Sequence, residues 1–171
     1  MWITALRCAI VVYTLFQWDK VVNDMTNLLI GEYEHTLDEK KRISLPKAFR
    51  VPLGKRVVMT RGFDNCLFIF SRISWDKIAE KLQSLSFVDT DSRGFNRWML
   101  SGAAEVDVDD VGRILISDTH KDHAGLQKDV VFAGISDRVE IWDAQRWHVY
   151  KTRIENDAER MAAKLGEIGA L

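Results

Sequence analysis

Hydrophobic and polar residues follow the same order twice along the 171-residue chain. In each half, a polar turn-forming run leads on to two short, continuous apolar runs. In the first half, residues 33–37 alternate in polarity and the apolar runs cover 57–59 and 66–70. In the second half the apolar runs cover 130–132 and 139–142. Alternation and short apolar runs between turn-forming residues are typical of β-strands, so the pattern predicts a β-rich fold of the α+β class.

An internal repeat underlies this pattern. Shifting the chain by 71 residues aligns GEYEHTLDEKKRISL (31–45) with GAAEVDVDDVGRILI (102–116). This agreement, which includes a charged pair at fixed spacing, indicates a tandem duplication. One repeat alone would expose unpaired strand edges, so we expect the two repeats to share one barrel-like core. The identical positions are Gly31 with Gly102, Glu34 with Glu105, Asp38 with Asp109, Arg42 with Arg113, and Ile43 with Ile114.

Helices are predicted to connect and finish the strand units. A short helix should carry Pro46 in its first turn and end at Gly54, since proline suits a helix start and glycine a helix end. A second helix should begin at Ser74 as its N-cap, and a third is expected in the link before Gly102. The residues that define their apolar faces are Trp75, Ile78, Leu82 and Leu85 for one, and Phe95, Trp98 and Met99 for the other.

The C-terminal segment carries a heptad-like apolar seam. Its members recur at alternating steps of three and four residues, as in helices that pack lengthwise on a partner. Two interpretations stay open: the seam packs on its own domain, or it contacts another subunit. The seam consists of Trp147, Tyr150, Ile154, Ala158, Met161, Leu165 and Ile168.

Composition narrows the class of protein. Hydrophobic residues make up 47% and charged residues 29% of the chain, which is typical of a globular protein. No stretch reaches the roughly 20 apolar residues that a membrane span requires, so the sequence predicts no integral membrane protein. The two cysteines, Cys8 and Cys66, lack the CxxC pairing of a zinc site and favour a reduced, cytosolic chain. The net charge of −1 gives no global indication of nucleic-acid binding.

Residues 1–24 stand apart from the repeats. A single Arg7 followed by an apolar run imitates a secretory signal, but no small-x-small cleavage pattern follows. Three interpretations compete: a helical N-terminal extension, a misassigned start upstream of Met25, and a signal anchor.

Catalytic chemistry has little support in the sequence. Asp107, Asp109 and Asp110 could suggest a magnesium site, but only the Asp109 position recurs in the first repeat. His120 and His123 share a helical spacing without a third ligand, so we expect a pair on a helix surface. The motifs GxSxG, P-loop and GxGxxG are absent from the sequence. We therefore predict a protein without enzymatic activity and without a cofactor or metal.

The repeated DxxxR motif is the feature that most needs an explanation. Asp38 and Arg42 form it in the first repeat, and Asp109 and Arg113 form it in the second. Such a pair can fasten a tight turn between two strands. Alternatively, the turn presents its arginine and neighbouring amides to a phosphate or a guanine edge.

Local charge favours DNA contact by the first repeat. Residues 38–61 hold eight basic residues against two acidic ones, a local charge of +6. Residues 109–133 hold three basic residues against five acidic ones, a local charge of −2. A cluster of cations is a plausible phosphate-binding surface. We therefore hypothesise that the first repeat contacts nucleic acid while the second mainly holds the fold or partners.

The strings LLIGEYEHTLDEKKRISLP (28–46) and HAGLQKDVVFAGISDRVEIWDAQRW (123–147) resemble the MraZ family of bacterial transcriptional regulators. The resemblance covers about residues 27–155, which favours Met25 or a nearby codon as the functional start. It implies two tandem SpoVT/AbrB-type domains with swapped-hairpin-like repeats, ring-like homo-oligomers, and binding of guanine-containing direct repeats in double-stranded DNA. It also implies regulation of the division and cell-wall gene cluster by a cytoplasmic, nucleoid-associated protein. Its DxxxR motifs would place Asp38, Arg42, Asp109 and Arg113 at the DNA. The local charge adds Lys40, Lys41, Lys47 and Arg50 as expected phosphate contacts.

Two departures from the family pattern concern these residues. The family has glycine before the arginine of the motif; Gly112 keeps it, whereas the first repeat has Lys41. The family's Pro-x-Lys-Phe-Arg becomes Pro-Lys-Ala-Phe-Arg at 46–50, which moves Lys47 by one position. An AbrB-type antitoxin is the neighbouring alternative, although such proteins usually carry a single copy of the domain. A carboxylate-dependent metal enzyme is the alternative from another class.

The predicted organisation divides the chain into five segments. The first is an extension, two are SpoVT/AbrB-like repeats joined by a helical link, and the last is a C-terminal helix. Their bounds are 1–24, 31–78 for repeat 1, 79–101 for the link, 102–149 for repeat 2, and 150–171.

Overall fold

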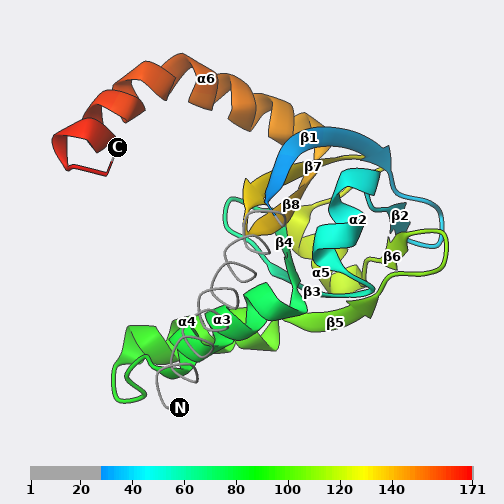
Figure 1. Ribbon diagram of the computed structural model, residues 1–171, viewed down its shortest axis with the longest axis horizontal. Helices are drawn as coiled ribbons and strands as arrows, with labels where there is room; N and C mark the ends of the chain where they lie inside the picture. Colours follow the sequence, from blue (N-terminus) through cyan, green and yellow to red (C-terminus); the bar gives the residue numbers. More distant parts are fainter. Residues whose placement is uncertain (1–27, 171) are drawn as a thin grey trace, which may run out of the picture.

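The computed structural model describes residues 28–170, so the predictions for residues 1–24 and for Met25 lie outside the described residues. Two layers of helix flank a large sheet, and a long C-terminal helix projects from the body (Figure 1). The strands are β1 (Leu29–Thr36), β2 (Arg42–Ser44), β3 (Arg56–Arg61), β4 (Leu67–Ser71), β5 (Ala104–Asp107), β6 (Arg113–Leu115), β7 (Asp129–Ser136) and β8 (Arg138–Asp143). The helices are α2 (Lys47–Leu53), α3 (Arg72–Gln83), α4 (Thr90–Ser101), α5 (Asp118–Ala124) and α6 (Ala144–Glu167).

The two repeats exchange their edge strands. The six-stranded sheet has the order β1-β7-β8-β4-β3-β5, and all of its neighbours are antiparallel. Strand β1 of the first repeat therefore pairs with β7 of the second, and β5 of the second pairs with β3 of the first. The prediction of an α+β fold with swapped-hairpin-like repeats is confirmed. The sheet ends in edge strands β1 and β5, so the described core lies against an open sheet and not inside a closed barrel.

A second, smaller sheet joins the repeats at their centre. Strands β2 and β6 pair antiparallel, with Ile43 opposite Ile114. The 71-residue shift maps β2 onto β6 and α2 onto α5 without an offset. The internal repeat found in the sequence is therefore a structural repeat with approximate two-fold symmetry.

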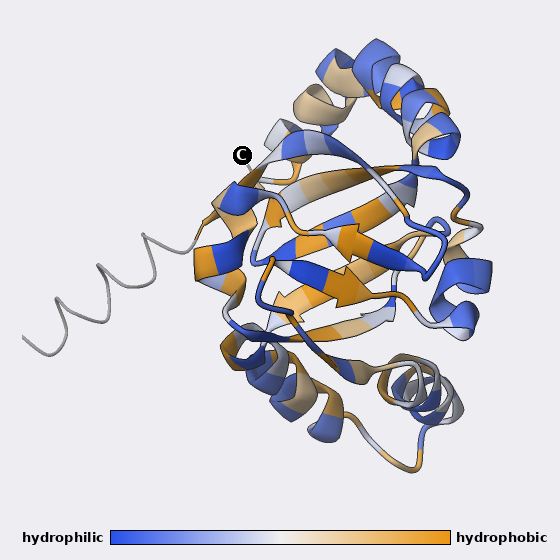
Figure 2. Cartoon of the chain, turned by 90° about the vertical axis from the view of Figure 1, so that its right-hand side faces the viewer, coloured by the Kyte–Doolittle hydropathy of each residue, from blue (hydrophilic) through white to orange (hydrophobic). Residues whose placement is uncertain are grey.

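The main core lies between the six-stranded sheet and the β2–β6 pair with its two short helices. Both repeats contribute to it through the inward positions of alternate strand residues. In Figure 2 the central strands carry many hydrophobic (orange) residues, and the helices carry many hydrophilic (blue) ones. The largest side chains buried there are Ile43, Leu45, Phe49, Met59, Leu67, Ile69, Ile114, Ile116, Leu126, Phe132 and Ile141.

The opposite face of the sheet is covered by α3, α4 and the first turns of α6. This second core explains why β3, β4 and β8 are apolar without alternation, since strands buried on both faces place apolar residues at every position. Its buried members are Val58, Cys66, Phe68, Phe70, Trp75, Leu82, Met99 and Trp142.

The helices agree with the sequence prediction in position and differ at their ends. Pro46 is the N-cap of α2 rather than a residue of its first turn, and Gly54 is its C-cap as predicted. The N-cap of α3 is Ser71, whose hydroxyl accepts a hydrogen bond from the Ser74 backbone, so the prediction of Ser74 as the cap was wrong. Leu85 lies beyond the end of α3 and is exposed.

Helix α6 packs on the body only through its first turns. Trp147 and Tyr150 contact the second core. Within residues 28–170, no side chain of α6 is buried, and the rest of the apolar seam is half-buried or exposed. The interpretation that the seam packs on its own domain is therefore supported for Trp147 and Tyr150, whereas Ala158, Leu165 and Ile168 are exposed and Ile154 and Met161 are half-buried.

The shared core gives a direct stability test at two adjacent residues. Ile116 is 0% exposed and Leu115 is 54% exposed. We expect Ile116→Ala to lower the free energy of unfolding by about 2–4 kcal/mol, because it removes buried methyl groups and leaves a cavity. Leu115→Ala, the matched control, should change it by less than about 0.5 kcal/mol. Urea unfolding measures both, and equal losses would contradict this description of the core.

Candidate nucleic-acid interface

The first DxxxR motif forms a closed turn before β2. The Asp38 carboxylate accepts hydrogen bonds from the Arg42 backbone at 2.8 Å and from Arg42 Nε at 2.9 Å. Arg42 Nη2 lies 2.7 Å from the same carboxylate. The backbone closes the turn too, since Asp38 N donates to Arg42 O at 2.9 Å. Asp38 therefore holds Arg42 through both oxygens, Oδ1 binding the backbone N–H and Oδ2 binding the guanidinium.

The second motif has the same geometry before β6. The Asp109 carboxylate accepts from the Arg113 backbone and from Arg113 Nε, both at 2.8 Å, and Arg113 Nη2 lies 2.8 Å away. Asp109 N donates to Arg113 O at 2.9 Å. Both motifs thus fasten a tight turn, as the structural interpretation of DxxxR expected. In Figure 1 the two loops that lead into β2 and β6 extend from the same side of the body.

The position before each arginine adopts a left-handed backbone conformation. Lys41 has φ +59° and Gly112 has φ +83°. An L-residue in this region costs roughly 1–2 kcal/mol relative to its usual conformation, whereas glycine adopts it freely. A side chain at Gly112 would also collide with the Arg50 guanidinium, since an added Cβ would lie 2.3 Å from its Cζ. The first repeat therefore has a strained lysine at the position where the second has an unstrained glycine.

Strand exchange places each turn against the other repeat. Lys41 O accepts from Ile116 N and Gly112 O accepts from Leu45 N, both at 2.8 Å. The Lys41 ammonium also forms an ion pair with Asp118 at the start of α5. Lys121 and Lys128 of the second repeat lie beside the first turn, whereas Arg50 and Lys55 of the first repeat lie beside the second turn.

The basic residues of segment 38–61, which carries the local charge of +6, consequently lie around both turns and not around the first alone. Arg50 donates from Nε to Leu45 O at 2.9 Å, beside Gly112, and so belongs to the surroundings of the second turn. Lys40 is exposed in the first turn, and Lys47 is exposed at the start of α2. Lys121 and Lys128 were missed as neighbours of the first turn, because the sequence repeat identifies equivalent residues and does not show which repeat packs on which.

Two of the three carboxylates considered for a metal site have arginine partners. Asp107 forms a 2.7 Å ion pair with Arg56, and Asp109 holds Arg113. Among residues 28–170, no group of three or more His, Cys, Asp or Glu side chains is arranged to hold a metal ion. The alternative of a carboxylate metal enzyme thus has no convergent site in this part of the chain.

The two histidines of α5 point into the protein. The His120 ring is buried and lies 2.8 Å from Ser117 Oγ and 2.8 Å from Gly102 O. His123 Nε2 lies 3.0 Å from Gly62 O. The prediction of a helix-surface pair was wrong, because α5 packs against the loops at Gly62 and Gly102 with this face.

Exchanging the residues at the left-handed position separates backbone strain from charge. We expect Lys41→Gly to raise the free energy of unfolding by about 0.5–1 kcal/mol, since strain relief exceeds the loss of one exposed ion pair. Lys41→Ala retains the strain and should not stabilise. Gly112→Ala should destabilise by more than about 1 kcal/mol, because it adds both strain and a collision with Arg50. Chemical denaturation of the three variants checks the signs.

The turn carboxylates should make stability sensitive to acid. Hydrogen bonds from the Arg42 backbone lower the pKa of Asp38, and those from the Arg113 backbone lower the pKa of Asp109. A lowered folded-state pKa contributes stability that is present above the unfolded value of about 3.9 and is lost as pH falls through the folded value. The double variant Asp38→Asn/Asp109→Asn should be less stable at pH 7 and lose less stability on acidification.

Unfolding free energies measured between pH 7 and pH 3 test this expectation. Asp110→Asn removes an exposed carboxylate from the same turn as Asp109 and controls for net charge. Parallel pH curves for the double variant and the unchanged protein would contradict the assignment.

Comparisons with known proteins agree with the repeat structure. A family model described as "MraZ protein, putative antitoxin-like" matches twice, over residues 28–98 and 99–165. The transcriptional regulator MraZ of Acetivibrio thermocellus is 44% identical over 142 residues, covering 83% of this chain and 99% of the relative. The transcriptional regulator MraZ of Caldanaerobacter subterraneus subsp. tengcongensis is 45% identical over 138 residues, covering 81% of this chain and 96% of the relative.

These relatives agree with the geometry described above. The two matches of the family model begin 71 residues apart, which is the shift that superposes β2 on β6 and α2 on α5. No helix within residues 28–170 combines the length and the apolar character needed to cross a membrane. With two tandem matches of the family model and relatives of more than 40% identity over most of its length, the chain belongs to the MraZ family of transcriptional regulators.

Proposed function

We propose that this protein is a sequence-specific DNA-binding regulator that acts by binding rather than by catalysis. The observation that carries the proposal is the pair of equivalent turns, each with an arginine held by an aspartate on the same side of the body. The names of the relatives support transcriptional regulation. The family resemblance adds the target: guanine-containing direct repeats upstream of the division and cell-wall gene cluster, in a nucleoid-associated cytoplasmic protein that represses it.

The geometry of the pair suits base recognition. Asp38 binds the Nε and Nη2 atoms along one side of the Arg42 guanidinium. A guanidinium has a second donor edge, formed by its two Nη atoms, and this edge matches the O6 and N7 acceptors of guanine. Holding the side chain in place before binding reduces the conformational entropy lost on contact. In this proposal Arg42 and Arg113 read bases, and Asp38 and Asp109 position them.

Nearby cations would supply affinity without sequence preference. Lys40 and Lys41 lie in the first turn, and Lys47 and Arg50 lie on α2. Each phosphate contact releases counterions, so binding should fall steeply with salt concentration. Single small modules bind weakly, and a ring of subunits that presents identical turns to tandem repeats gains affinity through effective concentration. The homo-oligomer is therefore part of the proposed mechanism.

Alanine substitution of the two arginines tests the proposal. Fluorescence anisotropy should show that Arg42→Ala weakens binding to the direct repeats by about 10–100-fold, the equivalent of one bidentate base contact. Arg113→Ala should weaken it less, because the second turn itself carries Asp110, Val111 and Gly112 where the first carries Lys40 and Lys41, and only Arg50 and Lys55 of the other repeat bring cations beside it. Arg160→Ala, which removes an exposed cation from α6, serves as the control. Equal losses for all three variants would leave only non-specific attraction.

Spacing of the DNA repeats tests whether several turns bind together. A change of half a helical turn should reduce affinity if rigidly held modules engage adjacent repeats.

The description "antitoxin-like" of the family model favours a second candidate, an AbrB-type module that binds DNA and a protein partner. A protein that binds its repeats irrespective of their spacing, and retains a copurifying partner, would favour this second candidate.

A further inference from the structure

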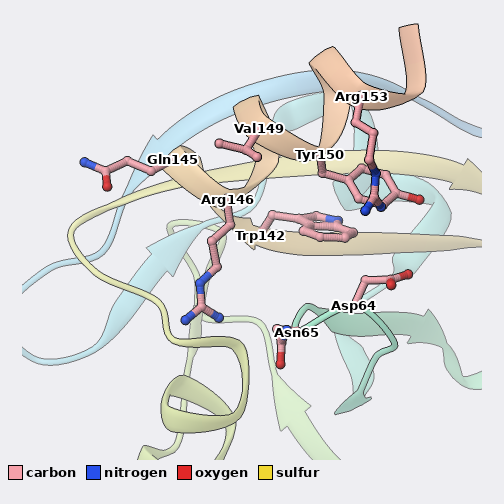
Figure 3. Close-up of a pocket in the computed structure, with 8 residues that line it drawn as sticks. All are labelled: Asp64, Asn65, Trp142, Gln145, Arg146, Val149, Tyr150 and Arg153. Carbon is pink, nitrogen blue, oxygen red and sulfur yellow. The ribbon is translucent and has the colours of Figure 1, made fainter. Parts of the chain in front are cut away.

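A groove lies where α6 leaves the body, outside the two DxxxR turns. It has a volume of about 560 Å³, within the range of small-ligand sites in proteins. One wall is the first part of α6 and the other is the β3–β4 turn (Figure 3). Its lining residues are Asp64, Asn65, Trp142, Gln145, Arg146, Val149, Tyr150 and Arg153.

The floor of the groove is aromatic, and its rim carries Arg146 and Arg153 together with the carboxylate of Asp64. The ring centroids of Trp142 and Tyr150 are 4.9 Å apart, and the Arg153 guanidinium lies 5.2 Å from the Tyr150 centroid. Figure 3 shows Arg153 beside these rings and Arg146 extending away from α6 toward the segment below it. Arg146 Nη1 donates to Ala124 O at 3.2 Å, which anchors this guanidinium to the end of α5. An aromatic floor with cations at its edge favours an apolar side chain flanked by carboxylates.

A related groove lies beneath α3, at the equivalent position of the first repeat. It is lined by α3 residues, including Ile78 and Lys81, and by Ser136 and Asp137 of the β7–β8 turn. There, an apolar residue from a third segment, Leu28, contributes to the lining. Every lining residue of the α6 groove belongs to its two walls or to Trp142 at the end of β8. Of the two related grooves, only the one beneath α3 is lined by an apolar residue from a third described segment.

The α3–α4 loop has the chemistry that matches the α6 groove. Phe87 is 82% exposed and Val88 is 71% exposed, at the tip of this loop. Asp89 and Asp91 follow directly and place two carboxylates beside the apolar pair. Exposed, adjacent apolar side chains at a loop tip are typical of a contact surface.

The loop is held in shape by its own hydrogen bonds. Arg93 Nη1 donates to the backbone carbonyls of Phe87 at 3.0 Å and of Val88 at 2.5 Å. The Asp89 carboxylate caps α4 by accepting from Ser92 N at 2.7 Å. The loop thus presents Phe87 and Val88 on a fixed backbone, which lowers the entropic cost of binding.

Within one chain, this loop and the α6 groove lie far apart. The loop is at the lower end of the body in both views, whereas α6 starts near the upper end (Figures 1 and 2). We propose that Phe87 of one copy inserts into the α6 groove of a second copy, with Asp89 and Asp91 facing Arg146 and Arg153. The two surfaces differ, so the contact is head-to-tail and closes into a ring when the rotation permits. This inference rests on the proposed function, which includes a homo-oligomer, and it identifies the contact between neighbouring subunits.

Loss of the loop side chains tests the contact without DNA. Phe87→Ser/Val88→Ser should lower the oligomeric mass by native mass spectrometry, or raise the midpoint of dissociation by at least about tenfold. Val51→Ser is the matched control, because Val51 is 87% exposed on α2. An unchanged mass for the loop variant would overturn the proposal, as would a monomeric parent protein.

Charge reversal distinguishes insertion of the Phe87 loop into the groove from pairing of two α6 helices through their apolar seams. Arg153→Glu should weaken assembly, and adding Asp91→Arg to the same chain should restore it. If assembly is lost in Ile154→Ser/Met161→Ser and retained in Arg153→Glu, pairing between α6 helices replaces the proposed contact. Binding of the dissociated loop variant to one DNA repeat is measured separately. An intact oligomer that fails to bind DNA would refute the proposed function alone.

Discussion

Antiparallel pairing between the two repeats is the interaction on which the structure depends. Strand β1 completes the half of the sheet built by β7 and β8, and β5 completes the half built by β3 and β4. Neither repeat alone can satisfy the backbone donors and acceptors of its outer strands or bury both sides of its core. Pairing of β2 with β6 brings Ile43 and Ile114 together at the centre of that core.

The exchange also determines the composition of each candidate DNA-binding turn. Backbone bonds from Ile116 to Lys41 and from Leu45 to Gly112 fix each turn against the opposite repeat. Charge counted along the sequence is therefore a poor measure of charge around a turn. Arg50 belongs to the first repeat in sequence and to the surroundings of the second turn in space. Any difference in DNA binding between the two turns therefore depends mainly on the residues within each turn.

Sequence analysis predicted the local elements and the repeat better than their mutual arrangement. The 71-residue shift, the short helix ended by Gly54 and the turn geometry of Asp38 with Arg42 all follow from local preferences. The assignment of Ser74 as a helix cap failed because Ser71 offers the same hydroxyl three residues earlier. The His120 contact with Gly102 and the groove beneath α6 are formed by segments distant in sequence, which periodicity alone does not bring together.

Fusion of two repeats in one chain lets equivalent positions diverge, which identical copies in a symmetric dimer cannot do. At the left-handed position, Gly112 leaves room for the Arg50 guanidinium, whereas Lys41 accepts strain and pairs with Asp118. A cost of roughly 1–2 kcal/mol in a domain of marginal stability is substantial. A glycine would avoid this cost, and an exposed ion pair offsets little of it. The ion pair with Asp118 therefore does not by itself account for a lysine at this position, and the proposed function adds a second role for Lys41, a contact with a DNA phosphate.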